Sequence, residues 1–495
     1  MSAVLAIDQG TTGTTCLVFD EHGRVQGRAY SEFTQHYPQP GWVEHDATEI
    51  WQVTLRVARE ALAAAGGNIP AAIGITNQRE TVVVWERTSG EPVQRAIVWQ
   101  DRRTAPLCRS LREQGREPFV RQRTGLVLDP YFSATKLAWL LDNVAGLRAR
   151  AAAGELAAGT IDTWLIWNLT GGRVHATDPT NAARTLLYDI RRLDWEDELL
   201  ELFGVPRALL PEVTPSAGSF GVTTLFGGEV PVAGVAGDQQ AALFGQGCVH
   251  AGLAKNTYGT GAFLLLNTGK EPVASAHGLL TTVACGPRGE PAYALEGAIF
   301  IAGAAVQWLR DELQIISGAD ETEALARSLE SNDGVYFVPG FVGLGAPHWN
   351  PDARGTIVGL TRGTGRAHLA RAALEAMAHS TRDVLEAMTA DSGVTAQELA
   401  VDGGASANDW LMQFQADVLG VPVRRPHLVE TTALGAAALA GIGARLWRDA
   451  HGFLSENEAP TVFQPRMEAA LRDRVTSGWN RAVRAALSWA GDDAG

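Results

Sequence analysis

Cysteine is scarce in this chain, with four residues among 495, and acidic residues outnumber basic ones by 55 to 41. Cys16, Cys108, Cys248 and Cys285 lie far apart in the sequence, so neither a disulfide framework nor a cysteine zinc site is indicated. Each is expected to be a buried, inert thiol in a reducing cytoplasm. The net charge of −14 argues against nucleic acid or an anionic membrane surface as the main partner.

Long apolar runs are absent as well. The longest stretch of small apolar residues, 433–443, is shorter than the roughly 20 residues that a membrane-spanning helix needs. It is better explained as a tightly packed core helix. Asp8 interrupts the region where a secretory signal peptide would need an unbroken apolar stretch. The sequence therefore predicts a cytoplasmic protein without a membrane span.

The length and composition of the chain are typical of a globular enzyme. Apolar residues make up 46% of the chain and charged residues 19%, and 495 residues are too many for one hydrophobic core. Strand-like runs at 71–76 and 81–85 and a helix over 368–388, ended by Ser392-Gly393, illustrate an alternation that continues along the chain. This alternation predicts α/β layers in at least two domains.

The segment 8–15, Asp-Gln-Gly-Thr-Thr-Gly-Thr-Thr, is the most informative motif. It joins two short apolar runs and so predicts a strand, a tight polar turn and a second strand. Glycine lets a ligand approach the backbone closely, and successive N–H groups in such a turn can hold an anion. Asp8 could hold hydrated Mg²⁺ against nucleotide phosphates. Taken alone, the segment is equally compatible with an ordinary hairpin.

A second copy of this pattern lies far downstream. Residues 255–262 form another Gly-Thr-Gly turn between apolar runs, and the strand–glycine–helix pattern at 235–242 is repeated at 399–408. Each half thus contains one glycine hairpin and one helix start of the kind that binds anions. We infer a duplicated α/β domain with a nucleotide between the halves. The boundary is placed between Gly245 and Ala254, giving domains 1–248 and 249–495.

Between these turns lies a group of polar and aromatic residues suited to a small polyol. Arg79 offers a fixed fork of donors, Glu80 only accepts, and Tyr131 does either. Trp99 and Phe263 could close the apolar edge of a pocket. The alternatives are a solvated Arg–Glu pair in a turn and aromatic residues that belong to the ordinary core. Asp238 could likewise accept a proton from an attacking hydroxyl or cap the helix that follows it.

Several longer segments resemble the FGGY carbohydrate kinase family. The segments that resemble the glycerol-phosphorylating branch of that family are 41–46, 74–81, 96–100, 237–246, 256–261 and 343–349. Residues 131–143, with Lys136 and Trp139, resemble the first signature of the wider family. The similarity runs from about Val4 to Trp489.

The resemblance implies two actin-like, ribonuclease H-like ATPase domains with the active site in the cleft between them. It also implies ATP-dependent phosphorylation of glycerol to sn-glycerol 3-phosphate, the first step of glycerol catabolism, with Mg²⁺ as the metal. By resemblance, Asp8 holds Mg²⁺ through water, and Thr11, Thr12 and Gly13 face the terminal phosphates. Glycerol is assigned to Arg79, Glu80, Tyr131, Asp238 and Gln239, with Trp99 and Phe263 as the apolar wall and Asp238 as the catalytic base. ATP contacts from the second domain are assigned to Thr260, Gly303, Gln307, Gly404 and Asn408.

Two departures from the family pattern concern the nucleotide and regulation. Many relatives have a basic residue where this chain has Thr15, which puts one nucleotide contact in doubt. The stretch 223–230 lacks the Arg of a sugar-bisphosphate loop and the histidine that some relatives phosphorylate. Neither type of regulation is expected from this loop.

Two other functions stay open at this point. A kinase for another polyol or a pentulose would use the same scaffold, although Arg79-Glu80 with Trp99 argues against it. A chaperone or filament ATPase would not need a polyol pocket, and no peptide-binding appendage is evident. The sequence also leaves open whether the chain acts alone or as a homodimer or homotetramer.

Overall fold

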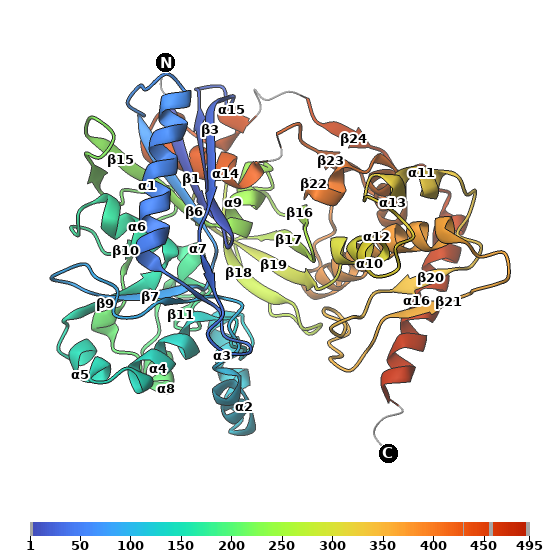
Figure 1. The fold of residues 1–495 in the computed structure, drawn as a ribbon, viewed down its shortest axis with the longest axis horizontal. Coiled ribbons are helices and arrows are strands. Elements are labelled where there is room, and N and C mark those ends of the chain that lie inside the picture. Colours follow the sequence, from blue (N-terminus) through green and yellow to red (C-terminus); the bar gives the residue numbers. More distant parts are fainter. Residues whose placement is uncertain (1–2, 429, 455–458, 492–495) are drawn as a thin grey trace.

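The computed structural model of the protein describes residues 3–428, 430–454 and 459–491. Two lobes are visible in Figure 1, each built around a large mixed sheet. The first sheet has the order β14 (Val222–Thr223), β15 (Val230–Gly237), β6 (Ala72–Asn77), β1 (Val4–Gln9), β2 (Gly13–Phe19) and β3 (Val25–Glu32). The second has the order β18 (Leu280–Cys285), β19 (Pro291–Ile299), β17 (Ala262–Gly269), β16 (Leu253–Tyr258), β22 (Glu398–Gly403), β23 (Val423–Arg425) and β24 (Thr461–Phe463).

The two sheets repeat one strand plan. In the first, β1 pairs antiparallel with β2 and parallel with β6. In the second, β16 pairs antiparallel with β17 and parallel with β22. The strands outside each hairpin, β3 and β19, are antiparallel in both sheets, and β15 and β23 add a further parallel pair. The predicted duplicated α/β fold is confirmed, and the two glycine turns occupy matching positions.

Each sheet is covered on both faces, which explains why its central strands are apolar throughout. In β1, Leu5 and Ile7 belong to the core beneath the helix α1 (Ala47–Ala64), whereas Val4 and Ala6 belong to the core beneath α14 (Thr431–Gly443). In the second sheet, α12 (Arg366–Ser392) and α13 (Asp409–Leu419) cover one face. The predicted helix around 368–388 is confirmed, and Gly393 ends it in the left-handed conformation with φ 68°.

The helices α9 (Asp238–Gly245) and α14 cross between the lobes. The helix α9 follows a strand of the first sheet and packs against Leu265 and Ala400 of the second, while α14 follows the second sheet and packs against the first. The two helices touch closely, because a Cβ at Gly435 would lie 1.9 Å from the carbonyl oxygen of Ala241. This contact explains the run of small residues at 433–443 and confirms a packed core helix there.

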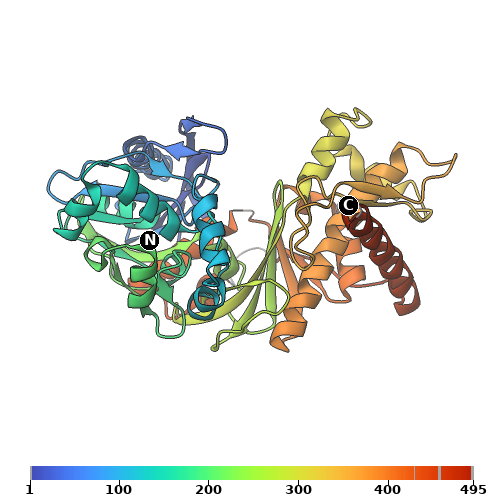
Figure 2. The same ribbon diagram turned by 90° about the horizontal axis from the view of Figure 1, so that it is seen from below.

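The hairpin of β18 and β19 also belongs to both lobes. Its Val283 and Tyr293 lie in the core of the first lobe, whereas Leu295 and Ile299 lie in the core of the second. The Tyr293 hydroxyl donates to the Ile190 carbonyl at 2.5 Å. In Figures 1 and 2 these strands run between the lobes. The hairpin therefore fixes residues of the second half inside the first.

The remaining elements surround these sheets. A third sheet has the order β4 (Gln35–His36), β5 (Glu44–His45), β8 (Ala96–Ile97), β7 (Val82–Glu86) and β9 (Leu156–Thr160). Three two-stranded sheets pair β10 (Ala176–Thr177) with β13 (Glu212–Val213), β11 (Tyr188–Asp189) with β12 (Asp194–Trp195), and β20 (Tyr336–Val338) with β21 (Thr356–Val358). In the first half, the further helices are α2 (Ala105–Glu113), α3 (Glu117–Thr124), α4 (Ser133–Asn143), α5 (Leu147–Ala152), α6 (Ile161–Leu169), α7 (Pro179–Ala182) and α8 (Asp197–Phe203). In the second, they are α10 (Gly303–Asp311), α11 (Glu321–Arg327), α15 (Ala450–Leu454) and α16 (Ala469–Gly491).

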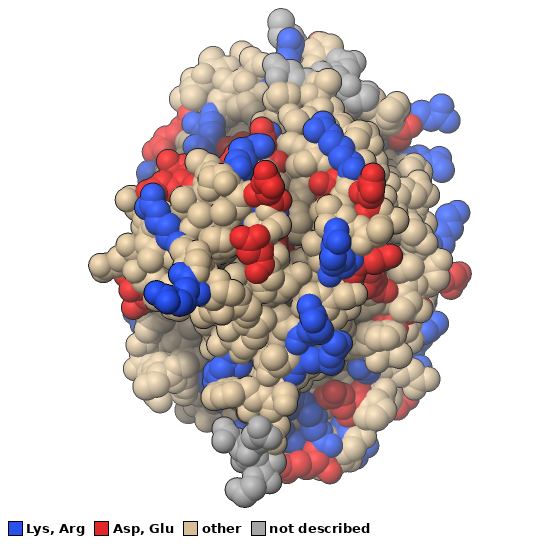
Figure 3. Space-filling view, turned by 90° about the vertical axis from the view of Figure 1, so that its right-hand side faces the viewer, with Lys and Arg blue, Asp and Glu red and all other residues tan. Residues whose placement is uncertain are grey.

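The surface charges of the second lobe are mixed in sign (Figure 3), and the cysteines form no disulfides. Acidic and basic side chains are interspersed on the outer face of the second lobe in Figure 3. All four cysteines are free and buried. Within the described part of the chain, no helix has both the length and the apolar character needed to cross a membrane.

Candidate active site

The first glycine hairpin lies next to the aromatic part of the predicted polyol site. The turn is closed by a hydrogen bond from Gly10 N to the Gly13 carbonyl at 3.0 Å. The Thr11 hydroxyl accepts the indole N–H of Trp99 at 2.9 Å. Thr12 is exposed at the tip of the turn, while Gly13 is buried at the start of β2.

Asp8, at the end of β1, has an unusual environment for a carboxylate. Within the described residues its side chain accepts no hydrogen bond and forms no ion pair. Desolvation by the surrounding protein, together with the nearby carboxylates of Asp238 and Glu430, raises its pKa to about 7. A partly exposed carboxylate that lacks a protein cation is suited to an external one, and carboxylate oxygens are ligands that Mg²⁺ prefers. The residues present therefore fit the expected metal.

Arg79 is at the centre of the predicted polyol site. It is 3% exposed and lies two residues after the end of β6. Its Nε lies 3.1 Å from Asp238 Oδ1, and its Nη1 lies 2.6 Å from Glu296 Oε2. Its Nη2 reaches the hydroxyl of Tyr131 at 3.4 Å. The structure thus brings three of the predicted residues together in one cluster.

Glu80 is held in a strained backbone conformation beside Arg79. Its φ of 62° lies in the left-handed region, which costs a residue with a side chain about 1–3 kcal/mol. Its carboxylate is 2.6 Å from Arg184 Nε, and its carbonyl accepts the hydroxyl of Ser133 at 3.1 Å. Burial raises the pKa of Glu80, while the guanidinium groups of Arg184 and Arg79 oppose that rise. Such strain at a buried charge is typical of functional sites.

Aromatic rings border this cluster on one side. The rings of Trp99 and Tyr131 meet edge to face, with centroids 5.5 Å apart. Burial raises the pKa of the Tyr131 hydroxyl well above its usual value, so this group stays protonated and can donate. Phe263 pairs with Ala298 across β17 and β19, and alternation along the strand places Ala298 on the same face as Glu296. Phe263 therefore lies on the sheet face that carries Glu296.

Asp238 begins α9 and remains accessible. Gly237 is the N-cap residue and provides no side-chain cap, while Asp238 Oδ1 accepts the N–H of Gln239 at 2.6 Å. The Asp238 side chain is 33% exposed, in contrast to Arg79 and Glu80. It is thus the most exposed carboxylate of the cluster.

Gln239 contacts the second half of the chain. Its side-chain oxygen accepts a hydrogen bond from Lys255 Nζ, and the same ammonium donates to the Thr257 hydroxyl at 2.8 Å. Lys255 is fully buried, and burial lowers its pKa to about 8. Thr257 lies three residues before Thr260, which is in the turn of the second glycine hairpin. At most about 10 Å of chain therefore separates the contact between Lys255 and Thr257 from that turn.

The residues predicted to contact ATP line one cavity of about 580 Å³ in the second lobe. They are Thr260, Gly303, Gln307, Gly404 and Asn408. The helix α10 begins at Gly303, whose N–H donates to the Gly259 carbonyl at 3.0 Å, so Gly303 and Gln307 lie one turn apart. Asn408 caps α13 by accepting the N–H of Leu411 at 2.9 Å. The cavity joins the second hairpin to two helix starts.

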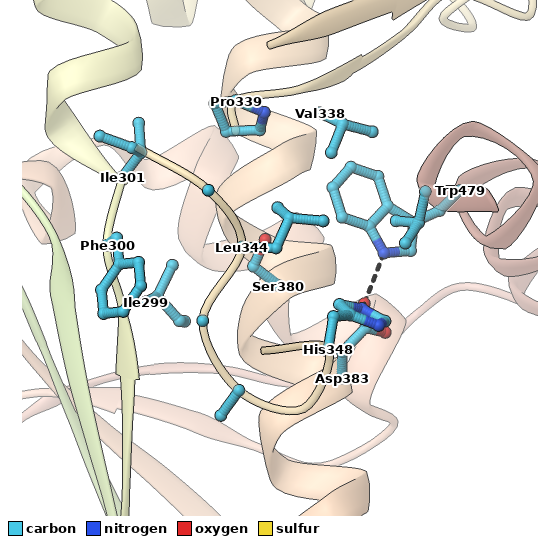
Figure 4. A pocket seen from close by; sticks show the side chains of 14 residues that line it. Ile299, Phe300, Ile301, Val338, Pro339, Leu344, His348, Ser380, Asp383 and Trp479 are labelled. Carbon is cyan, nitrogen blue, oxygen red and sulfur yellow. Dashed lines mark hydrogen bonds and ion pairs between the residues drawn. The ribbon is translucent and has the colours of Figure 1, made fainter. Parts of the chain in front are cut away.

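A smaller cavity of about 40 Å³ lies elsewhere in the second lobe (Figure 4). Its lining is mainly apolar, and the indole of Trp479 donates to Asp383 at 2.6 Å on one side. This volume holds at most a few water molecules. It has no room for a nucleotide or a sugar.

Three buried charged residues of the cluster were not singled out from the sequence. They are Arg184, Glu296 and Lys255. Arg184 and Glu296 lie in segments without a glycine turn, and Lys255 precedes the second hairpin as one of only three lysines in the chain. The scarcity of lysine could have marked Lys255, whereas only the tertiary contacts identify the other two.

The boundary between residues 248 and 249 stays a prediction. The two departures noted in the sequence can be located: Thr15 pairs with Asp8 across the first hairpin, and 223–230 forms the turn between β14 and β15. Thr15 brings no cation to Asp8, in agreement with the raised pKa of that carboxylate.

Comparison with known proteins extends these observations to the whole chain. Residues 3–245 match the N-terminal domain of the FGGY family of carbohydrate kinases, and residues 254–444 match its C-terminal domain. The chain is 57% identical over 493 residues to glycerol kinase 2 of Thermotoga maritima, covering 99% of each chain. It is 58% identical to a glycerol kinase of Halorhodospira halophila, covering 98% of this chain and 97% of the other.

One solved structure is similar to this chain in both fold and sequence. The crystal structure of Plasmodium falciparum glycerol kinase with ADP superimposes with a TM-score of 0.94 at 37% identity and covers 98% of both chains. The two matching family domains fall one in each half of the chain, and the relatives are more than half identical over its full length. The chain therefore belongs to the FGGY family of carbohydrate kinases.

Proposed function

We propose that this protein transfers the γ-phosphoryl group of ATP to glycerol, producing sn-glycerol 3-phosphate in the cytoplasm. The observation that carries the proposal is the buried cluster in which Arg79 Nε faces the accessible carboxylate of Asp238 beside an aromatic wall. The full-length identity to proteins named glycerol kinases supports the same substrate.

Glycerol would bind at this cluster. A triol of three carbons needs donors and acceptors at fixed positions, and Arg79, Tyr131 and Asp238 provide both kinds. Gln239 adds an amide, Glu80 a further acceptor, and Trp99 with Phe263 an apolar border for the carbon chain. The edge-to-face contact between Trp99 and Tyr131 limits the room on that side, which favours a short polyol over a pentulose.

ATP would occupy the cavity lined by Thr260, Gly303, Gln307, Gly404 and Asn408, with its phosphates directed to the two glycine hairpins. Turns of this kind present N–H groups to anions, and helix starts add a favourable dipole. In the first hairpin, Thr11, Thr12 and Gly13 would face the terminal phosphates. Asp8 would hold Mg²⁺, which neutralises phosphate charge when bound.

The protein's own contribution to the reaction is alignment and proton transfer. Phosphoryl transfer needs the hydroxyl in line with the γ-phosphorus and little covalent chemistry from the enzyme. Asp238 would accept the proton of the attacking glycerol hydroxyl, since it is the accessible carboxylate of the cluster. The ion pair with Arg79 Nε at 3.1 Å holds this carboxylate in position. Closure of the lobes would keep water from competing as the nucleophile.

A coupled assay of ADP release tests the proposal directly. The purified protein is supplied with Mg-ATP and glycerol, xylulose, ribulose or gluconate in turn, and kcat/KM is compared. We expect glycerol to give by far the highest value. A higher kcat/KM for a pentulose would refute glycerol as the substrate and leave only membership of the family. Turnover stimulated by peptide or by self-assembly, without any polyol, would instead indicate a chaperone or filament ATPase.

A further inference from the structure

Glu296 brings a carboxylate of the second half of the chain into the polyol cluster of the first. It lies on β19 and is 1% exposed. Its Oε2 accepts Arg79 Nη1 at 2.6 Å, and its Oε1 accepts Arg79 Nη2 at 3.2 Å and Arg184 Nη2 at 2.9 Å. Glu296 therefore binds Arg79 through both terminal nitrogens and shares one oxygen with Arg184.

The four charges of this network alternate in sign. Arg184 lies between Glu296 and Glu80, at 2.9 Å and 2.6 Å, so two guanidinium groups and two carboxylates balance. All four side chains are almost fully buried. Burial alone would raise the pKa of Glu296, but Arg184 and Arg79 lower it to about 2, so it is ionised at every physiological pH. Without Glu296, the two buried guanidinium groups would keep Glu80 as their one buried counter-charge, with the partly exposed Asp238 beside Arg79, and they would move apart or admit water.

The bidentate contact determines which edge of Arg79 faces the substrate site. A guanidinium group is planar and rigid, so two fixed terminal nitrogens fix its plane. The remaining donor, Nε, then lies 3.1 Å from Asp238 Oδ1. Gln240 supports this arrangement by accepting from Arg79 Nη1 at 3.2 Å. The orientation of the predicted glycerol-binding arginine is thus set by a residue of the other half.

The strand that carries Glu296 is anchored in both lobes. Leu295, its neighbour, lies in the core of the second lobe, whereas Tyr293 lies in the core of the first. The Gln240 amide donates to the Thr282 hydroxyl at 3.0 Å and to the Val283 carbonyl at 3.2 Å on the adjoining strand. A shift of β19 relative to the first lobe would therefore move Glu296 and, with it, the guanidinium group of Arg79.

We propose that Glu296 is a positioning residue for glycerol binding. It orients Arg79 directly and Glu80 through Arg184, so the pocket has its binding geometry only while β19 is docked against the first lobe. This inference rests on the proposed function and adds to it a cross-lobe requirement. Both carboxylate oxygens of Glu296 accept hydrogen bonds from guanidinium groups, and the residue is 1% exposed.

The test separates glycerol affinity from nucleotide affinity. In Glu296→Gln, the amide keeps the size of the side chain but loses the charge and one acceptor. A displaced Arg79 loses a charge-assisted hydrogen bond to glycerol, which should weaken glycerol binding by about 10- to 100-fold, with ATP binding unchanged. Titration calorimetry with glycerol and, separately, with a non-hydrolysable ATP analogue measures both dissociation constants. Glu375→Gln is the matched control, since Glu375 is a buried carboxylate of the second lobe paired with Arg371 at 2.7 Å and outside the cluster.

A second variant covers the case in which Glu296→Gln does not fold. Glu296→Asp keeps the charge but withdraws it by one methylene group, and it should weaken glycerol binding less than Glu296→Gln. The inference is overturned if a folded variant binds glycerol as tightly as the wild type. It is also overturned if glycerol and nucleotide affinities fall together, as expected of a general packing defect. If the wild-type protein itself binds no glycerol, the proposed function fails, which is a different result from wild-type binding with insensitive variants.

Discussion

The indole nitrogen of Trp99 lies 2.9 Å from the hydroxyl oxygen of Thr11, and this bond joins the aromatic wall of the polyol cluster to the first glycine hairpin. The Trp99 ring also meets Tyr131 edge to face. One side chain thus contacts both the predicted substrate site and the predicted phosphate site. A substitution at either site should therefore alter ligand binding at the other.

The first prediction tests this contact with a double-mutant cycle. Trp99→Phe keeps an aromatic ring but removes the N–H, and Thr11→Val removes the acceptor. Each should lower kcat/KM for glycerol and for ATP, and the two effects should be coupled by about 0.5–1.5 kcal/mol, as for a neutral hydrogen bond. Steady-state kinetics of the single and double variants give the coupling. Strictly additive losses would mean that the bond does not link the two sites.

The second prediction concerns Asp238 as the base. Asp238→Asn keeps the size of the side chain but cannot accept the hydroxyl proton, so kcat should fall by about 10²–10⁴-fold. ATP affinity should hardly change, and glycerol affinity should fall modestly because one acceptor becomes partly a donor. Thermal stability should be close to that of the wild type, since Gly237 and not Asp238 is the N-cap of α9. A variant that keeps kcat within about tenfold of the wild type would exclude Asp238 as the base.

The third prediction separates the two ligand sites through Thr260. Thr260→Val retains the β-branched shape and removes the hydroxyl of a residue that lines the nucleotide cavity. The KM for ATP should rise by about tenfold, the equivalent of one lost hydrogen bond to a charged group, while glycerol binding stays the same. Kinetics at varied ATP and calorimetry with glycerol provide the two readouts. Equal losses for both ligands would point to a folding defect.

The fourth prediction uses the raised pKa of Asp8. Its folded pKa of about 7 exceeds the ordinary value of 3.8, so the folded state binds this proton more tightly than the unfolded state. Stability should therefore fall as the pH rises from about 4 to 7 and then level off. In metal-free buffer at pH 8, Asp8→Asn should melt at a higher temperature than the wild type, and the difference should vanish near pH 4. Thermal unfolding monitored by circular dichroism measures both.

Magnesium provides the matching control for the same variant. Added Mg²⁺ should raise the melting temperature of the wild type at pH 8 and leave that of Asp8→Asn unchanged. The metal should have less effect on the wild type below pH 7, because a protonated carboxyl is a poor ligand. An equal response of both proteins to Mg²⁺ would place the metal elsewhere.

Much of the fold follows from local patterns. The glycine turns at 8–15 and 255–262 are recognisable because a tight hairpin restricts which residues can occupy it, and the helix ending at Gly393 is recognisable because the left-handed conformation favours glycine. The repetition of turn types in each half is sufficient to predict a duplicated domain. These features depend on residues close together in the chain, so the sequence displays them directly.

The arrangement of the charges depends on contacts that no local pattern records. Glu296 and Arg79 are 217 positions apart, and Arg184 is 104 from Glu80. A buried glutamate in a strand has no distinguishing neighbours in sequence, and its role becomes visible only when the first lobe supplies the guanidinium groups. The sequence by itself determined the two lobes, their phosphate turns and the kind of residue available to each ligand. The tertiary structure alone decided which of those residues share one buried network, because burial makes each charge depend on partners that folding brings from distant segments.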